Sequence, residues 1–302
     1  MNMKVEKKNQ FLINKVFTIP YIDKLINTKN IPNSLCQCIN RYVKGDDLTY
    51  GSVLTQIYSY MNDNYRNEYF YKNTLLNKLL VEKIKVHTLA ALTELPISNS
   101  KADFITIGEN DINENNGIVY EIKTDLDTFA RLQSQIDDYY KVFSYVYVVI
   151  SSNQFEKAKE FLKTSSVGIY ELTKNGDLIC RKKAIYNRND LSYEAMFQLL
   201  RKYEFEKIIK EHYKTLPNVN DFQYYRECLK WIKEINIITF QKKVMECLKR
   251  RTLLTENDDN IIEIPYELRF YVYFSKRYRN KNNEINRFLN QKIDIFKINK
   301  IQ

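Results

Sequence analysis

The order of predicted elements between residues 89 and 184 constrains this chain more than any other feature. Residues 102–107 and 118–123 are rich in apolar and β-branched side chains and flank a polar segment, which predicts a β-hairpin. Apolar residues at helical spacing over residues 126–143 predict a helix, and the continuous apolar run at 145–150 predicts a strand covered on both faces. Strands, a helix and a further strand in this order predict an α/β fold.

Helical patterns dominate on both sides of this segment. Apolar residues recur at intervals of three and four over residues 48–86, and again between residues 191 and 248. The first 45 residues are polar, and Pro20 and Pro32 predict irregular structure there. We therefore expect three parts, which are an N-terminal helical region at residues 1–88, an α/β core at residues 89–185 and a C-terminal helical, basic region at residues 186–302.

Composition bears on the location of the protein. No apolar run approaches the roughly 18 residues that a membrane-spanning helix needs. The first residues carry charge but no apolar signal-peptide core behind it. The five cysteines are odd in number and scattered, which argues against a disulfide framework. We expect a cytoplasmic protein without membrane segments.

Composition also narrows the chemistry. The sequence holds only two histidines, His87 and His212, and neither has a second His or Cys at ligand spacing. This argues against a zinc site, and the absence of a GxSxG motif argues against a serine hydrolase of the nucleophile-elbow type. Catalysis by this chain would therefore depend on carboxylates, lysine and a hard metal ion.

The predicted hairpin carries the residues for such chemistry. Side chains alternate along a strand, so Glu121 and Lys123 point to one face while Ile122 points to the other. Asp103 on the neighbouring strand shares the face of Glu121 if the register allows. Two carboxylates and the carbonyl oxygen of Ile122 are ligands that Mg²⁺ accepts, and Glu94 would add a third carboxylate. Lys123 could orient the attacking water or stabilise charge on a phosphate.

The following helix adds a polar line. Arg131, Gln135 and Tyr139 are spaced i, i+4, i+8 and share one side of the predicted helix, for which Asp125 or Asp127 would be the N-cap. Arg131 could bind a phosphate. The alternative for Arg131 is a surface ion pair with Asp127, four residues earlier.

These residues resemble the PD-(D/E)XK phosphodiesterases, the restriction-endonuclease-like superfamily. The match consists of Asp103, then Glu121-Ile122-Lys123, and then a helix with Gln135 and Tyr139 that is similar to the QxxxY motif of RecB-type nucleases. Ala102 stands where the superfamily's name has proline. The wider context also resembles a poorly characterised bacterial branch often met near mobile elements.

The resemblance covers residues 89–184 and implies a restriction-endonuclease-like αβββαβ core. It implies metal binding by Asp103 and Glu121, with Glu94 as a further candidate. It also implies that Lys123 positions the water, while Gln135 and Tyr139 act on phosphate or orientation. The alternative for Glu94 is a simple ion pair with Lys101 across a turn.

The last 34 residues are strongly basic, with nine Lys and Arg against two acidic residues. Lys and Arg residues alternate with aromatic residues there, which suits contact with phosphates and stacking on nucleobases. A basic terminal helix is, however, often only a solvent-exposed face. The candidate nucleic-acid-binding residues are Lys101, Arg131, Lys276, Arg277 and Arg279.

The expected function is that of a Mg²⁺- or Mn²⁺-dependent nuclease, with DNA favoured over RNA, endonuclease over exonuclease, and a role in restriction or phage defence. Two rivals stay open. One is a catalytically inactive module that binds nucleic acid or a protein on the same fold, and the other is an RNA-directed nuclease or a phage-encoded regulator. Assembly as a homodimer or with a partner protein is also left open.

Overall fold

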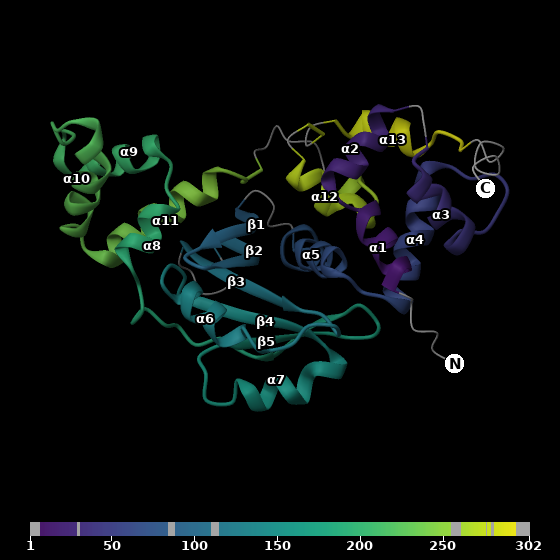
Figure 1. Cartoon of the computed structure of the whole chain (residues 1–302), viewed down its shortest axis with the longest axis horizontal. Helices are drawn as coiled ribbons and strands as arrows, with labels where there is room; N and C mark the ends of the chain where they lie inside the picture. Colours follow the sequence, from purple (N-terminus) through teal and green to yellow (C-terminus); the bar gives the residue numbers. More distant parts are fainter. Residues whose placement is uncertain are drawn as a thin grey trace. The chain divides into compact units, whose positions relative to one another are not determined.

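The computed structural model describes residues 7–28, 31–83, 88–109, 115–254, 261–275, 277–278 and 281–293 (Figure 1). The chain forms two compact units. Unit 1 consists of residues 1–85, 174–176 and 255–302, and unit 2 consists of residues 86–173 and 177–254. The predicted C-terminal region at residues 186–302 is thus divided between the two units. None of the helices in the described ranges has the length and apolar character needed to cross a bilayer.

Unit 2 is built on one six-stranded sheet whose spatial order follows the sequence. The first three strands pair antiparallel, β3, β4 and β5 pair parallel, and β6 returns antiparallel. The strands are β1 (Leu89–Ile97), β2 (Ser100–Glu109), β3 (Asn115–Lys123), β4 (Tyr145–Ser151), β5 (Gly168–Leu172) and β6 (Leu178–Lys182). The predicted α/β class is confirmed.

Helices complete unit 2. They are α6 (Leu132–Tyr140), a short 3₁₀ turn (Ser152–Gln154), α7 (Phe155–Phe161), α8 (Tyr193–Gln198), α9 (Lys202–Tyr213), α10 (Asp221–Lys233) and α11 (Ile237–Arg250). One core joins the apolar side chains of these helices to one face of the sheet, including Ile105, Val119 and Val148. Every residue of β4 is buried, as its continuous apolar sequence predicts. Gln241 on α11 donates to the carbonyl oxygen of Val142 at 2.7 Å and so ties α11 to the end of the α6 segment.

The helix predicted over residues 126–143 is shorter than expected. It begins at Leu132 with Arg131 as N-cap, so the predicted caps Asp125 and Asp127 are wrong. Asp127 instead accepts hydrogen bonds from the backbone and hydroxyl of Thr124, at 2.8 and 2.7 Å. This turn holds the chain out of helical geometry, and Leu126 within it is exposed.

Unit 1 is helical. Its α-helices are α1 (Lys7–Val16), α2 (Ile19–Asn27), α3 (Asn33–Tyr42), α4 (Tyr50–Asn64), α5 (Glu68–Leu76), α12 (Arg269–Phe274) and α13 (Asn282–Leu289), with a π-helical turn (Asn77–Val81) and two 3₁₀ turns (Ile261–Glu263 and Tyr266–Leu268). The expectation of irregular structure in the first 45 residues is wrong. Pro20 lies in the first turn of α2 and Pro32 is the N-cap of α3, positions where the missing N–H of proline costs nothing.

Asn73 on α5 joins the N-terminal helices of unit 1 to the C-terminal segment. Its amide group donates to the carbonyl oxygen of Tyr266 at 2.9 Å, and its Oδ1 accepts from the backbone N–H of Phe270 at 3.0 Å. Tyr271 and Tyr278 are buried in the same unit. Phe270, Tyr271 and Tyr278 therefore belong to the core of unit 1, and the expectation that these rings stack on bases is wrong.

Candidate functional site

The register of the sheet places three carboxylates in a row across β1, β2 and β3. The residue pairs on either side of Glu94 put it opposite Asp103. Extending the β2–β3 register one residue beyond the pair of Phe104 and Tyr120 puts Asp103 opposite Glu121. Directly opposed residues of an antiparallel pair point to the same face of a sheet. The row therefore lies on one face, at the point where β2 and β3 end their backbone pairing.

Asp103 itself closes that end of the pairing. Its Oδ2 accepts a hydrogen bond of 2.8 Å from the backbone N–H of Ile122, so a side chain takes the place of the next carbonyl in the ladder. Its own carbonyl oxygen accepts from the hydroxyl of Thr93 on β1 at 2.8 Å. Asp103 is half-buried and held from both neighbouring strands.

Glu121 is the centre of a buried polar network. The side chain is almost completely buried, with 1% exposed. Its Oε1 accepts from Lys123 Nζ and from the amide nitrogen of Gln135, each at 2.6 Å. Lys123 Nζ also donates to the amide oxygen of Gln135 at 2.8 Å. Three polar side chains are thus in contact. Glu121 and Lys123 share one face of β3 because side chains alternate along a strand, and Gln135 reaches them from α6.

Tyr139 completes the network from α6. Its hydroxyl oxygen lies 2.6 Å from Glu121 Oε2 and 3.0 Å from the carbonyl oxygen of Lys101. The phenol is fully buried, and burial, followed by the negative charge of Glu121, raises the pKa of Tyr139 far above its usual value. Tyr139 therefore stays protonated and acts as a hydrogen-bond donor at any ordinary pH.

Glu94 has an unusual backbone. Its φ is +56° although it is neither glycine nor asparagine and lies within strand β1. A non-glycine residue in this region is strained, and such strain is often found at functional sites. Its carboxylate forms an ion pair with Lys101, the alternative that the sequence left open. One carboxylate oxygen of Glu94 and one of Asp103 lie within 4.8 Å of each other.

The carboxylates of Glu94 and Asp103 could together hold a hard divalent cation. Carboxylate oxygens at this spacing on adjacent strands are the ligands that Mg²⁺ and Mn²⁺ prefer. Glu121 lies next in the row, but both its oxygens already accept hydrogen bonds from Lys123, Gln135 and Tyr139. A metal ion bound to Glu121 would therefore have to share its carboxylate with these donors. The backbone N–H of Ile122 donates a hydrogen bond to Asp103, whereas the predicted role of the Ile122 carbonyl oxygen as a metal ligand stays a prediction.

Of the predicted nucleic-acid-binding residues, Lys101 and Arg131 lie in unit 2 with the site, and Arg277 lies in unit 1. Arg131 precedes α6, is exposed and forms no ion pair with Asp127 in the described part of the chain. Lys101 lies beside the site but is paired with Glu94. Arg277 belongs to unit 1, is exposed and lies over the ring of Tyr278. Lys276 and Arg279 lie outside the described residues.

The sequence analysis did not identify Asp138, which lies on α6 and supports the site through hydrogen bonds to the β1–β2 turn. Its Oδ2 accepts from the hydroxyl of Ser100 at 2.7 Å and from the backbone N–H of Asn99 at 3.2 Å, and its Oδ1 accepts from Lys141 at 2.7 Å. Asp138 thus fastens the β1–β2 turn to the helix that carries Gln135 and Tyr139. The only signal in the sequence is an acidic residue between two positions of an apolar stripe, which is too weak to identify it.

Comparison with known proteins gives one family. A family model described as bacteriophage P4 protein cII matches residues 61–264, about two thirds of the chain. The matched range contains every residue of the carboxylate row and of the network around Glu121. No curated protein and no solved structure gives a significant match.

Proposed function

This chain belongs to the bacteriophage P4 protein cII family, and we propose that it is a metal-dependent nuclease whose active site is the row of Glu94, Asp103 and Glu121 with Lys123. The observation that carries the proposal is the geometry around Glu121. Two carboxylates oppose each other on adjacent strands, and a lysine two residues after the second one contacts it directly. In this proposal β1 to β4 and α6 form a restriction-endonuclease-like core.

The pattern of contacts supports specific roles for the side chains. Asp103 and Glu121, which oppose each other on β2 and β3, would hold the metal ion. Glu94, with one carboxylate oxygen within 4.8 Å of one of Asp103, and the carbonyl oxygen of Ile122 would be further ligands. Bound there, a divalent ion would neutralise charge on the phosphodiester and lower the pKa of a water molecule. Gln135 and Tyr139 would position Glu121, since each donates a hydrogen bond to its carboxylate.

Lys123 would position the water that attacks. Hydrolysis forms a bond from the water oxygen to phosphorus and breaks the bond from phosphorus to the leaving oxygen, which takes up a proton. The ammonium group of Lys123 is buried and held between Glu121 and Gln135, so it is fixed beside the carboxylate row. A fixed positive charge of this kind stabilises charge that develops on the phosphate.

The test is cleavage of plasmid DNA, linear duplex, single-stranded DNA and RNA by the purified protein with Mg²⁺ or Mn²⁺. We expect DNA cleavage that EDTA abolishes and that Asp103→Ala and Lys123→Ala each reduce by about 100-fold or more. Asp137→Ala is the matched control, because this acidic residue lies on the exposed side of α6. Intact DNA under every metal condition would refute the proposal, and preferential cleavage of RNA would reassign the substrate.

One observation favours a second candidate, a module that binds nucleic acid or a protein without cleaving anything. Both oxygens of Glu121 already accept hydrogen bonds from its own chain, and such a network can serve conformational specificity alone. The family description names a bacteriophage protein and no reaction, which leaves room for a phage-encoded regulator. Binding of DNA that persists in the Lys123→Ala variant, with no cleavage by either protein, would favour this candidate.

A further inference from the structure

Helix α9 and the second half of helix α11 in unit 2 run in opposite directions and are joined by two ion pairs. Near the start of α9, Glu204 forms an ion pair with Arg251, which directly follows α11. Near the end of α9, Glu211 accepts from Lys243, which lies halfway along α11, at 3.0 Å. Their shared apolar side packs into the core of unit 2 through residues such as Ile208 and Val244.

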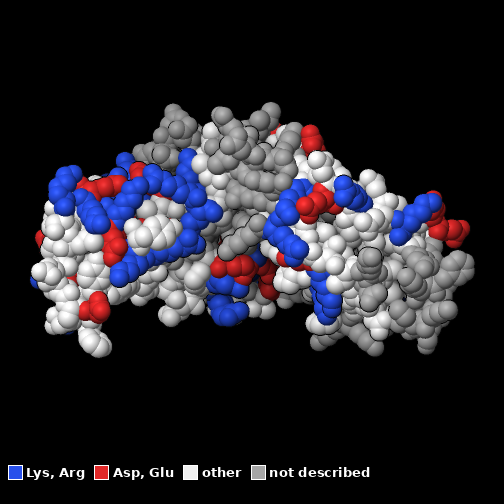
Figure 2. Space-filling view, turned by 90° about the horizontal axis from the view of Figure 1, so that it is seen from above, with Lys and Arg blue, Asp and Glu red and all other residues white. Residues whose placement is uncertain are grey.

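The sides of both helices that face away from the core are basic. On α9 and its C-cap, Lys207, Lys210 and Lys214 follow one another at i, i+3 and i+7. On α11, the same outer side carries Lys242, Lys243 and Arg250. Because the two helices are antiparallel neighbours with a common core side, their outer sides form one surface. At the left of Figure 2, over the region that Figure 1 labels α9 to α11, Lys and Arg side chains gather on the visible face.

Much of this charge is not neutralised within the protein. Lys210, Lys242 and Arg250 are exposed and form no ion pair with a carboxylate in the part of the chain that the structure describes. Lys214 is also exposed, and its ammonium group donates to the carbonyl oxygen of Glu211, which leaves its charge unpaired. The acidic side chains nearby are Glu206, which pairs with Lys202, Glu211, which is shared between Lys207 and Lys243, and Glu246, which pairs with Lys243.

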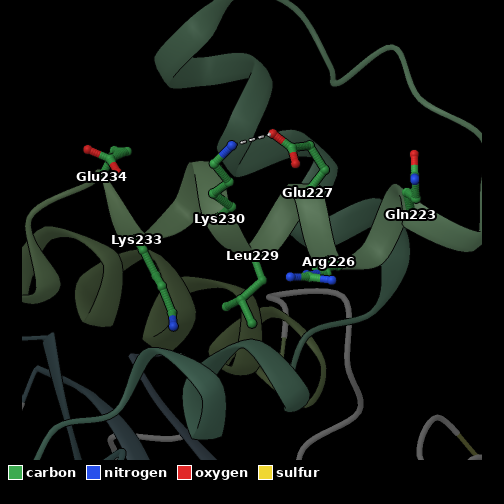
Figure 3. A pocket seen from close by; sticks show the side chains of 7 residues that line it. All are labelled: Gln223, Arg226, Glu227, Leu229, Lys230, Lys233 and Glu234. Atoms are coloured by element: carbon green, nitrogen blue, oxygen red, sulfur yellow. Dashed lines mark hydrogen bonds and ion pairs between the residues drawn. The ribbon is translucent and has the colours of Figure 1, made fainter.

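Helix α10 also carries basic residues on its surface, but their charge is neutralised. A groove of about 660 Å³ runs along its outer side and is lined by Arg226, Lys230 and Lys233 (Figure 3). Here the lysines are paired, Lys230 with Glu227 at 3.3 Å and Lys233 with Glu194 at 2.5 Å. Glu234 also lines the groove and offsets the charge of Arg226, so the groove is close to neutral. A long-range attraction for anions therefore arises from the α9–α11 surface rather than from α10.

We infer that the outer surface of α9 and α11 binds the phosphate backbone of a nucleic acid. This inference rests on the proposed function, because nucleic acid is the polyanion that the candidate site would act on. Unpaired lysines and an arginine along two adjacent helices can contact several successive phosphates, with no need to recognise bases. The surface would hold the substrate of the same unit that carries the carboxylate row.

The test compares two triple variants of the full chain in EDTA, where no metal-dependent cleavage occurs. The first combines Lys210→Gln, Lys242→Gln and Arg250→Gln. The control combines Lys157→Gln, Lys159→Gln and Lys163→Gln, which remove the same charge from exposed positions in and just after α7. Fluorescence anisotropy with labelled single-stranded and duplex DNA gives the Kd of each protein at several salt concentrations.

We expect the first variant to raise the Kd about tenfold or more at low salt. For each phosphate that the variant no longer neutralises, the slope of log K against log salt should become shallower by about 0.9 with duplex DNA and about 0.7 with single-stranded DNA. The control should bind as the unaltered protein does. Circular dichroism and thermal unfolding verify that both variants are folded. Equal weakening by both variants, or no weakening by the first, would overturn the inference.

The binding measurements test this surface separately from the proposed nuclease activity. If the unaltered protein binds DNA but never cleaves it, and the first variant alone loses binding, the nuclease proposal fails while this surface stands. If the unaltered protein cleaves DNA and both variants bind and cleave alike, the nuclease proposal stands and this surface is wrong.

Discussion

The hydroxyl group of Tyr139 on α6 donates a hydrogen bond of 2.6 Å to Glu121 on β3, in a place where both side chains are almost completely buried. The same oxygen lies 3.0 Å from the carbonyl oxygen of Lys101 on β2. One phenol thus connects a helix to two strands and fixes one oxygen of the central carboxylate. Lys123 and Gln135 fix the other oxygen.

Replacing this phenol should cost stability. We expect Tyr139→Phe to lower the free energy of unfolding by about 1–3 kcal/mol, because it leaves a buried, charged acceptor without one of its donors. Metal-dependent cleavage should fall less than in Lys123→Ala, since Lys123 and Gln135 still hold Glu121. Urea unfolding and the cleavage rate measure the two effects.

Tyr140→Phe is the matched control. The hydroxyl of this neighbouring tyrosine is buried and has no hydrogen-bond partner in the described part of the chain. Removing it should leave stability unchanged or raise it slightly, because a buried hydroxyl without a partner is itself costly. Equal losses in Tyr139→Phe and Tyr140→Phe would argue against the hydrogen bond to Glu121 as the cause.

The backbone at Glu94 predicts opposite effects on stability and on activity. With φ at +56°, Glu94→Gly should relieve strain and raise the free energy of unfolding by about 1 kcal/mol, offset in part by removal of the ion pair with Lys101. The same substitution removes a proposed metal ligand, so the concentration of Mg²⁺ needed for half-maximal cleavage should rise severalfold. Both quantities are measured on one protein preparation.

Ser98→Gly separates the two effects. Ser98 has φ of +52° in the turn after β1 and carries no carboxylate. Its substitution should give a similar gain in stability and leave the Mg²⁺ requirement unchanged. An unchanged Mg²⁺ requirement in Glu94→Gly would remove Glu94 from the set of metal ligands.

A substitution at Gln135 tests how added negative charge affects the network around Glu121. Gln135→Glu places a second carboxylate next to Glu121, and the single positive charge of Lys123, which contacts both positions, can balance only one of the two negative charges. The variant should therefore be more stable near pH 5, where one of the two carboxylates can take up a proton, than near pH 8, where both would have to be charged. Urea unfolding at several pH values tests this, and a pH-independent loss of stability would contradict it.

The sequence predicts those elements that a local pattern of side chains determines, and it fails for those that depend on contacts with distant residues. The buried strand β4 and the strands of the hairpin follow directly from their apolar and alternating side chains. Strand β1 is harder to identify because Pro96 lies within it. The strand is the first in the sheet order and so an edge, where proline is tolerated.

The start of α6 shows the limit of periodicity. The turn that ends at Asp127 is held by Gln154, whose amide donates to the carbonyl oxygen of Thr124 at 2.7 Å from 30 residues away. No local pattern reveals such a long-range interaction. Because the helix begins only at Leu132, Arg131 stands at its cap instead of on its polar line, whereas Gln135 and Tyr139 contact Glu121 as their spacing predicts.

Asp138 predicts how acid affects the support of the site. Burial alone would raise the pKa of this carboxyl group, but the hydrogen bonds from Lys141, Ser100 and Asn99 outweigh it and hold the pKa below its ordinary value of 3.8. A carboxyl group with a lowered folded pKa contributes stability above its unfolded pKa, and that stability is lost as the pH falls through the folded value.

We therefore expect Asp138→Asn to lower the free energy of unfolding by about 1–3 kcal/mol near pH 7, since the substitution removes a charged acceptor of three hydrogen bonds. The difference from the unaltered protein should shrink as the pH falls below 3.8, because the native carboxyl group is then increasingly protonated too. Asp137→Asn on the exposed side of α6 should change stability by no more than about 0.5 kcal/mol at either pH. Urea unfolding near pH 7 and near pH 3 measures both variants, and a loss in Asp138→Asn that persists unchanged in acid would mean that packing, not the charge on Asp138, fastens the β1–β2 turn to α6.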